Sequence, residues 1–253
     1  MDPVVIALLV IAALLAGTVD AIAGGGGLIT FPALITAGLP IHLAYGTNKG
    51  QSVWGSGSAL LAFWRAGRVD RKQALLTFPL GLVGSALGAL LALTLDEAVL
   101  RPLVIAMLIG AAVLLVIKKP SRDEDVVPPA DKRRRYLVLA ATLAFVIGAY
   151  DGFFGPGTGT FLFVGFVALC GKSTLRATAD AKVVNFASNL AAVAVFASRD
   201  AIAWELALPM AAGQLIGGLV GARLALRGAR LVRMMVLAVS GALVIKLVVD
   251  LVA

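Results

Sequence analysis

The sequence predicts an all-α polytopic membrane protein built from two repeats of inverted topology. Hydrophobic residues make up 60% of the 253 residues, and apolar stretches near the length of a membrane-spanning helix recur along the chain. The stretches in the second half repeat the order of those in the first, which indicates an internal repeat. Mean hydropathy is +0.98 and 14% of the residues are charged, whereas soluble domains contain about 25% charged residues. A soluble fold is therefore excluded.

Ten apolar segments are expected, five on each side of a polar linker. In each half a long and a short segment form a broken hairpin and three helices follow, which gives eight full spans and two short re-entrant arms. The N-terminal "VVIALLVIAALLAG" has no basic flank or convincing cleavage site, so we interpret it as a retained helix rather than a signal peptide. The segments lie at roughly 3–23, 28–38, 42–64, 73–94 and 98–117, then 136–152, 160–170, 176–197, 204–222 and 234–249.

Individual residues also match between the two halves. The motif "GTVDAIAGGG" (17–26) aligns with "GAYDGFFGPG" (148–157) at an offset of 131 residues, and further along the chain the offset becomes 133. A two-residue insertion in the second half explains the change. The matched pairs are Asp20 with Asp151, Gly24 with Gly155, Gly26 with Gly157, Lys49 with Lys182, Phe63 with Phe196, Gly84 with Gly217 and Gly88 with Gly221.

Basic residues are concentrated in four of the loops between the predicted segments. Together these loops hold 17 of the 22 Lys and Arg residues. An excess of Lys and Arg is typical of loops on the cytoplasmic side of a membrane. The loops are 65–72, 118–135, 170–176 and 223–233.

This charge pattern predicts that the two halves are inverted. Loop 65–72 is basic, whereas its counterpart at 198–205 carries more acid than base and is expected outside, as is loop 95–101. The linker 118–135 is then cytoplasmic and both termini lie outside. Repeats of inverted topology, here 1–117 and 136–253, are a recurring architecture of secondary transporters.

Two glycine-rich motifs are predicted to form hairpin tips inside the membrane. Because both ends of 136–170 are expected in the cytoplasm, this stretch must enter and return. Its second arm, about 16 Å long as a helix, is too short to cross a core of about 30 Å. The stretch 3–38 is expected to do the same from the outside. Glycine lets backbone N–H groups approach a ligand, and the helix N-terminus after each tip attracts anions.

We therefore predict an anion site near the membrane midplane, between the tips at 24–27 and 155–159. The alternative is that these glycines serve tight helix packing. That second interpretation is favoured for the GxxxG-type spacings elsewhere in the chain, at Gly84, Gly88, Gly213, Gly217 and Gly221.

An aspartate precedes each tip by four residues. Asp20 and Asp151 could carry a coupling proton, because charges inside a membrane are costly and usually functional. The slightly favoured alternative is that they hold the tips by accepting backbone N–H bonds. For an anionic substrate, we expect neither carboxylate to face the substrate directly.

A lysine lies several residues inside the next helix of each half. Lys49 and Lys182 could pair with an oxyanion, or they could reach towards the head-groups or pair with Asp20 or Asp151. Neutral polar side chains, including Ser188, surround them in sequence. The predicted substrate-binding residues are Gly24, Gly25, Gly26, Gly27, Thr47, Asn48, Lys49, Gln51, Ser52, Gly155, Gly157, Thr158, Gly159, Lys182, Asn185 and Asn189.

The sequence argues against an enzyme or a metalloprotein. A single Cys, Cys170, and a single His, His42, exclude a disulfide framework and disfavour a Cys/His metal site. The "CGKST" motif at 170–174 has Phe166 where a phosphate-binding loop needs glycine. No cofactor or metal is expected. No nucleic-acid partner is expected either, since the basic cytoplasmic loops explain the net charge of +8. Lys246 and Asp250 are interpreted as an interfacial ion pair.

The paired motifs resemble those of one transporter family. The stretches "AGTVDAIAGGGGLITFPALITAGLP", "TNKGQS", "YDGFFGPGTGTF" and "TADAKVVNFASN" look like the TauE/SafE sulfite exporter family, also called the toluene sulfonate uptake permease family, and its YfcA-like branch. The resemblance covers essentially the whole chain. It implies a multi-pass protein of a bacterial inner membrane that moves small sulfur-containing anions such as sulfite or organosulfonates, without a cofactor.

We therefore expect a secondary transporter of a small sulfur oxyanion that works by alternating access around the midplane site. An anion channel, or a transporter of another small organic anion, is the alternative. The expected partners are the anionic substrate and membrane lipid, and a homodimer is a possible assembly.

Overall fold

The computed structural model describes residues 2–96, 98–99 and 133–228. The predicted segments 98–117 and 234–249, nearly all of the linker and the Lys246–Asp250 pair lie outside these residues. Eight helices can be followed through the described ranges, and no strand lies within them. The helices are α1 (Pro3–Ala23), α2 (Gly27–Thr36), α3 (Ile41–Arg65), α4 (Arg71–Thr94), α6 (Arg133–Phe153), α7 (Thr158–Ala168), α8 (Thr174–Ala197) and α9 (Trp204–Leu226).

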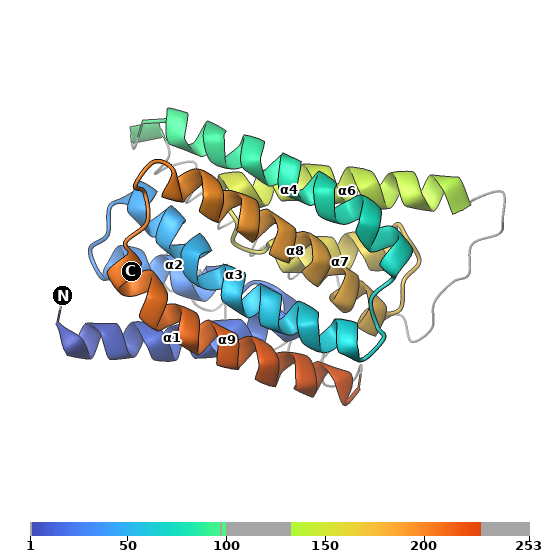
Figure 1. Ribbon diagram of the computed structural model, residues 1–253, viewed down its shortest axis with the longest axis horizontal. Helices are drawn as coiled ribbons and strands as arrows, with labels where there is room; N and C mark the ends of the chain where they lie inside the picture. The colour runs from blue at the N-terminus through green and yellow to red at the C-terminus, as the bar shows by residue number, and fades with distance from the viewer. Residues whose placement is uncertain (1, 97, 100–132, 229–253) are drawn as a thin grey trace, which may run out of the picture.

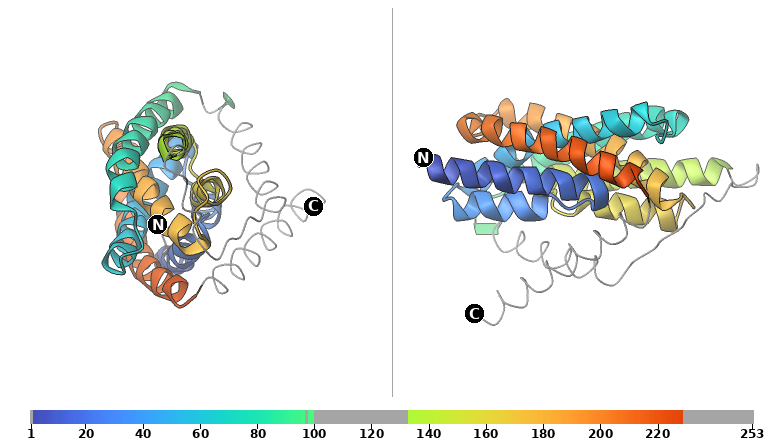
Figure 2. Two further views of the ribbon diagram at one scale, coloured as in Figure 1. Left: turned by 90° about the vertical axis from the view of Figure 1, so that its right-hand side faces the viewer. Right: turned by 90° about the horizontal axis from the view of Figure 1, so that it is seen from below.

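Five of these helices, namely α1, α4, α6, α8 and α9, are long and apolar enough to cross a membrane. Helix α3 has 25 residues, a sufficient length, but a run of polar residues around Lys49 lowers its hydropathy. The short apolar helices α2 and α7 have 10 and 11 residues, about half of the roughly 20 that a span requires. The long helices run roughly parallel to one another (Figures 1 and 2).

Local sequence signals define several helix ends. Asp2 caps α1, since its side chain accepts a hydrogen bond from Val4 N at 2.8 Å, and Pro3 occupies the first helical position. Asp70 caps α4 in the same way and accepts from Gln73 N at 3.2 Å. Both breaks predicted from the glycine-rich motifs are present, between α1 and α2 and between α6 and α7.

Glycines bring two pairs of helices into backbone contact. A Cβ added to Gly84 or Gly88 of α4 would overlap the carbonyl oxygens of Phe145 and Ala149 in α6. The packing role predicted for these glycines is confirmed. Figure 1 shows α4 beside α6 at one edge of the bundle and α1 beside α9 at the other.

The contact between α1 and α9 has the same form. A Cβ on Gly217 or Gly221 of α9 would overlap the carbonyl oxygens of Leu14 and Thr18 in α1. Gly213 contacts α1 one turn earlier. The contacting residues of α1 and α6 differ by 131 positions and those of α4 and α9 by 133. These are the same offsets that relate the sequence motifs.

An aromatic cluster packs beside the breaks. Phe31 of α2 lies with its ring centroid 4.8 Å from that of Tyr45 in α3, and 6.3 Å from that of Phe154, which directly follows α6. All three side chains are buried. Since Phe154 comes from the C-terminal half of the chain and the other two from the N-terminal half, this cluster helps to fix the two breaks next to each other.

Candidate functional site

The two helix breaks touch each other in the interior of the bundle. Gly24 ends α1 with φ +75°, and a Cβ at this position would overlap the backbone of Gly159 and Thr160 in α7. The Thr160 hydroxyl donates to the carbonyl oxygen of Ala23 at 2.9 Å. Glycine is required at position 24 both for the left-handed backbone and for this close approach.

Asp20 holds the first break and also binds a lysine. Its Oδ1 accepts a hydrogen bond from Gly26 N at 3.3 Å, which is the positioning role favoured from the sequence. Its Oδ2 lies 2.7 Å from Lys182 Nζ, and the same ammonium donates to the Asp20 backbone oxygen. The ammonium group of Lys182 is therefore bound to the end of α1.

Asp151 holds the second break through side chains, because no backbone N–H among the described residues donates to it as the sequence had predicted. Its Oδ1 accepts from Lys49 Nζ at 2.7 Å and from the Thr158 hydroxyl at 2.8 Å, and its Oδ2 accepts a short hydrogen bond from the Ser188 hydroxyl. Lys49 Nζ also donates to Asn189 Oδ1 at 3.3 Å. Gly155, with φ +94°, passes so close that an added Cβ would lie 2.7 Å from Lys49 Nζ.

The two ion pairs cross between the halves of the chain. Lys49 of α3 pairs with Asp151 of α6, and Lys182 of α8 pairs with Asp20 of α1. The Lys49–Asp151 side chains are 2% and 3% exposed, whereas the Asp20 side chain is 20% exposed. Of the interpretations open from the sequence, pairing with an aspartate is the one that the structure contains, and each pair is neutral as a whole.

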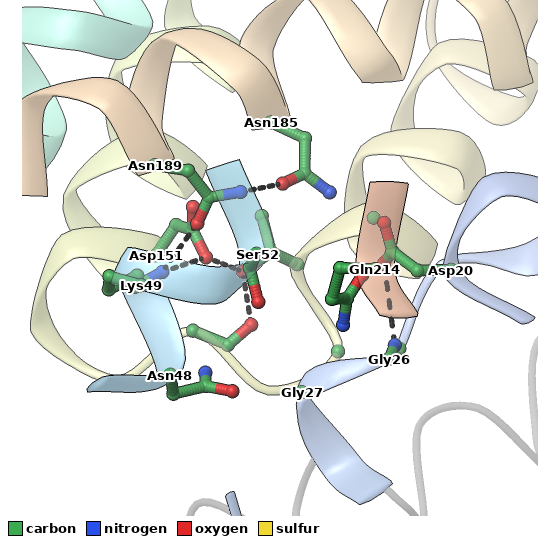
Figure 3. A pocket seen from close by; sticks show the side chains of 15 residues that line it. Asp20, Gly26, Gly27, Asn48, Lys49, Ser52, Asp151, Asn185, Asn189 and Gln214 are labelled. Carbon is green, nitrogen blue, oxygen red and sulfur yellow. Dashed lines mark hydrogen bonds and ion pairs between the residues drawn. The ribbon is translucent and has the colours of Figure 1, made fainter. Parts of the chain in front are cut away.

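A small polar pocket lies between the breaks (Figure 3). It offers about 20 Å³ of space, which is enough for about one water molecule, so it must widen before a sulfur oxyanion can enter. The lining residues are Asp20, Gly25, Gly26, Gly27, Asn48, Lys49, Ser52, Asp151, Gly155, Gly157, Thr158, Gly159, Asn185, Asn189 and Gln214.

Hydrogen-bond donors without partners are concentrated at this pocket. The N–H groups of Gly27 and Gly159, near the starts of α2 and α7, have no acceptor among the described residues. The side-chain oxygen of Asn48 accepts from Thr30 at 2.6 Å and from Gln51 at 3.0 Å, which leaves the Asn48 NH₂ group for the pocket. Such donors at helix starts favour an anion.

Asn185 supplies a second side-chain donor. Its oxygen accepts from Asn189 Nδ2 at 2.7 Å, and its NH₂ group is left on the side that lines the pocket (Figure 3). Together with Lys49, these amides form a donor set drawn from both halves of the chain. An oxyanion has only acceptor atoms, so this set matches its hydrogen-bonding capacity.

Four of the predicted substrate-binding residues do not line the pocket: Gly24, Thr47, Gln51 and Lys182. Thr47 Oγ1 instead accepts from Ala203 N at 3.0 Å, just before α9 begins. Gln51 Nε2 donates to Asn48 and Ser52 and orients them. Both aspartates line the pocket, each paired with a lysine. That neither carboxylate faces the substrate directly stays a prediction.

The sequence prediction missed Gln214. This residue lies in α9 beside the small residues Gly17 and Gly55, and its side chain reaches the pocket past them. A buried glutamine in an otherwise apolar helix was the available signal. It was overlooked because the position corresponding to Gln214 in the first half is Gly81, so the repeat pattern does not mark it.

A second charged cluster lies apart from the pocket. Lys172, between α7 and α8, is 2.8 Å from Asp70 Oδ2 and 3.2 Å from Asp180 Oδ2, while Asp70 N donates to Asp180 Oδ1 at 2.8 Å. Burial alone would raise the pKa of Asp70, but the hydrogen bond and charge of Lys172 outweigh it and lower that pKa. Burial would lower the pKa of Lys172, but Asp180 and Asp70 raise it.

Comparison of the sequence with known proteins identifies the family of this chain. The model of the sulfite exporter TauE/SafE family matches residues 9–247. The chain belongs to this family. A probable membrane transporter protein of Sinorhizobium sp., ORF9, is 42% identical over 97% of this chain and 93% of its own length. The probable membrane transporter protein YfcA of Escherichia coli K12 is 38% identical over 99% and 92% of the two chains.

A probable membrane transporter protein of Haemophilus influenzae is 37% identical over 97% of this chain and 95% of its own length. No solved structure gives a significant match. The family and its relatives make this chain a multi-pass membrane transporter of the TauE/SafE family, as the motifs indicated. The names of these relatives specify no substrate.

Proposed function

We propose that this protein is a secondary transporter of a small sulfur-containing oxyanion, of the sulfite or organosulfonate class, in a bacterial inner membrane. The carrying observation is the set of unpartnered donors from both helix breaks that surrounds one buried pocket. The family description, sulfite exporter, supports the sulfur oxyanion as substrate class. A tetrahedral or pyramidal oxyanion presents oxygens in several directions, which suits donors that converge from opposite sides.

The transport cycle that we propose rests on two inverted repeats, 1–117 and 136–253, joined by the cytoplasmic linker 118–135. Three matched features support this arrangement: the Gly–carbonyl contacts of α4 with α6 and of α9 with α1, the crossed ion pairs, and the two opposed breaks. Both termini would lie outside. Rocking of one repeat against the other would open the pocket to one side at a time.

Substrate binding would compete with the Lys49–Asp151 pair. The pocket holds about one water molecule in the present conformation, so an entering anion must separate groups that now touch. Lys49 lines the pocket and can turn its ammonium from Asp151 to the anion. Lys182 does not line the pocket and keeps Asp20, and through it Gly26, in place.

Charge balance supports coupling of transport to a proton. The four central charges, two lysines and two aspartates, sum to zero, so a bound monoanion would leave one uncompensated negative charge in a buried site. Such a charge is strongly unfavourable in a membrane interior. A proton on Asp151 would restore neutrality when Lys49 pairs with the anion. Lys49 faces this carboxyl from α3, and Thr158 and Ser188 contact it from α7 and α8.

Flux in proteoliposomes tests the proposal. Uptake of labelled sulfite should saturate with concentration. Any current that accompanies uptake should be no larger than the current that the turnover rate of a carrier produces. Unsaturable uptake with a measurable single-channel current would instead identify an anion channel. A panel of competitors, with sulfite, an organosulfonate and a carboxylate of similar size, would assign the substrate class. Lack of competition by either sulfur oxyanion would overturn that assignment.

A further inference from the structure

A long apolar groove lies on the outer surface of the bundle, away from the polar pocket. It encloses about 930 Å³ and is lined by side chains of α3, α8 and α9. All three tryptophans of the chain, Trp54, Trp64 and Trp204, line it. Their side chains are between 41% and 49% exposed, so the groove is open along its length.

The groove follows helix α3 and has a glycine in its floor. From Gly50 to Trp64 it extends along about 21 Å of helix, at a rise of about 1.5 Å per residue. Gly57 has no side chain and lies against Phe186 of α8. The hydroxyl of Ser58 is turned away, since it donates to the carbonyl oxygen of Leu215 at 3.0 Å. The surface left in the groove is therefore almost entirely apolar.

One end of the groove is strongly basic. Trp64 lies at this end, and the guanidinium of Arg71 stacks over its ring at 5.5 Å from the centroid. Arg65 at the end of α3, Arg68 in the loop that follows and Lys72 at the start of α4 are also exposed. The loop's acid, Asp70, is paired with Lys172 and does not neutralise them.

We propose that this groove is a binding site for an anionic phospholipid. One acyl chain would lie along Trp54 and Leu61, and the phosphate would bind Arg71 and its basic neighbours beyond Trp64. Tryptophan is enriched where a membrane protein meets the lipid head-groups, and clusters of Lys and Arg attract anionic lipids. The apolar groove and the basic end together match both parts of such a lipid.

A second copy of the chain fits the groove less well. A two-fold dimer in a membrane has its axis along the membrane normal. The two grooves would therefore face each other with their equivalent ends at the same depth in the membrane. The basic residues of loop 65–72 would then face those of the partner, which is unfavourable without an intervening anion. An anionic lipid removes this repulsion, because it supplies the missing negative charge.

The tryptophans provide a direct test that requires no transport assay. Protein in phosphatidylcholine vesicles is titrated with brominated phosphatidylglycerol or brominated phosphatidylcholine, and tryptophan fluorescence is measured. The brominated anionic lipid should quench more strongly at equal mole fraction. Replacement of Arg71 by Gln should reduce the preference about fivefold, while quenching by brominated phosphatidylcholine remains.

Arg134→Gln provides the matched control, because Arg134 is an exposed arginine near the start of α6, away from the groove. This variant should keep the full preference. Equal quenching by the two lipids, or an unchanged preference in a double Arg65→Gln and Arg71→Gln variant, would overturn the proposal. Absence of quenching by either lipid, together with a cross-linked dimer, would instead identify a second copy as the occupant.

Discussion

Lys49 Nζ lies 2.7 Å from Asp151 Oδ1, although 102 positions separate the two residues in the sequence. Both side chains are almost completely buried, and the pair sits where the two helix breaks meet. The position-matched pair, Lys182 with Asp20, has the same separation of 2.7 Å but a more exposed carboxylate. The site therefore contains two similar ion pairs in unequal surroundings, and this inequality leads to different predictions for the two.

Replacing Lys49 by Met should abolish saturable uptake and also destabilise the protein. The variant leaves the Asp151 carboxylate buried without its partner, and loss of one member of a buried pair costs about 3–5 kcal/mol. Thermal unfolding in detergent and sulfite flux in proteoliposomes are the measurements. The double variant Lys49→Met with Asp151→Asn should recover most of the stability but not the flux. Normal flux in Lys49→Met would remove this residue from the site.

Asp151→Asn should uncouple transport from the proton gradient. The amide cannot take up the proton that we propose to balance the bound anion, so accumulation driven by a pH difference should be lost while exchange of labelled for unlabelled substrate continues. Asp20→Asn is the comparison, because Asp20 is paired with Lys182 and positions Gly26. This change should reduce both activities together. Proton-driven accumulation in Asp151→Asn equal to that of the wild type would refute the coupling role.

The Lys172 cluster should make stability depend on pH at both extremes. The pKa of Asp70 is lowered in the fold, so its contribution is present above the unfolded value of about 3.9 and is lost as pH falls through the folded value. The pKa of Lys172 is raised. Its contribution is complete below about 10.4 and is lost as pH rises through the folded value. The contributions of Asp70 and Lys172 should therefore both be level between these limits.

The variant Lys172→Met tests this dependence. It should unfold at a lower temperature at neutral pH, because Asp180 is buried and loses its cation. It should also show a smaller loss of stability on acidification. Lys72→Met, an exposed lysine beside Asp70, is the control and should behave as the wild type. An acid transition that is the same in Lys172→Met and in the wild type would contradict the assignment.

Cysteine labelling should place positions 68 and 199 on opposite sides of the membrane. Arg68 lies in the loop before α4, and Arg199 lies in the corresponding loop before α9. The native Cys170 should not interfere, because it is buried and burial raises the pKa of its thiol to about 11, which leaves little reactive thiolate. An impermeant maleimide should label one of the variants Arg68→Cys and Arg199→Cys in intact cells. Labelling of both from one side would rule out inverted repeats.

Sequence reasoning was accurate where the signal is local or periodic. The apolar segments within the described residues, the breaks after Ala23 and Phe153, and the packing glycines of α4 and α9 follow from hydropathy, glycine conformation and small-residue spacing. Such features depend on a few neighbouring residues and on the membrane as solvent, so a single chain is enough to predict them. The matched offsets of 131 and 133 were likewise visible before any contact was known.

Partner choice between distant side chains depended on the tertiary structure. The sequence left each lysine with several possible partners, and only the packing of α3 against the second break selected Asp151 for Lys49. The packing of α3 against α9 turned Thr47 towards the start of α9 and brought Gln214 to the pocket. Hydrogen bonds and ion pairs act over about 3 Å, whereas sequence pattern specifies a helix face but not the neighbour that it meets. The sequence thus determined which helices and helix breaks contribute residues to the polar site. Three-dimensional packing decided which atoms of those residues contact one another.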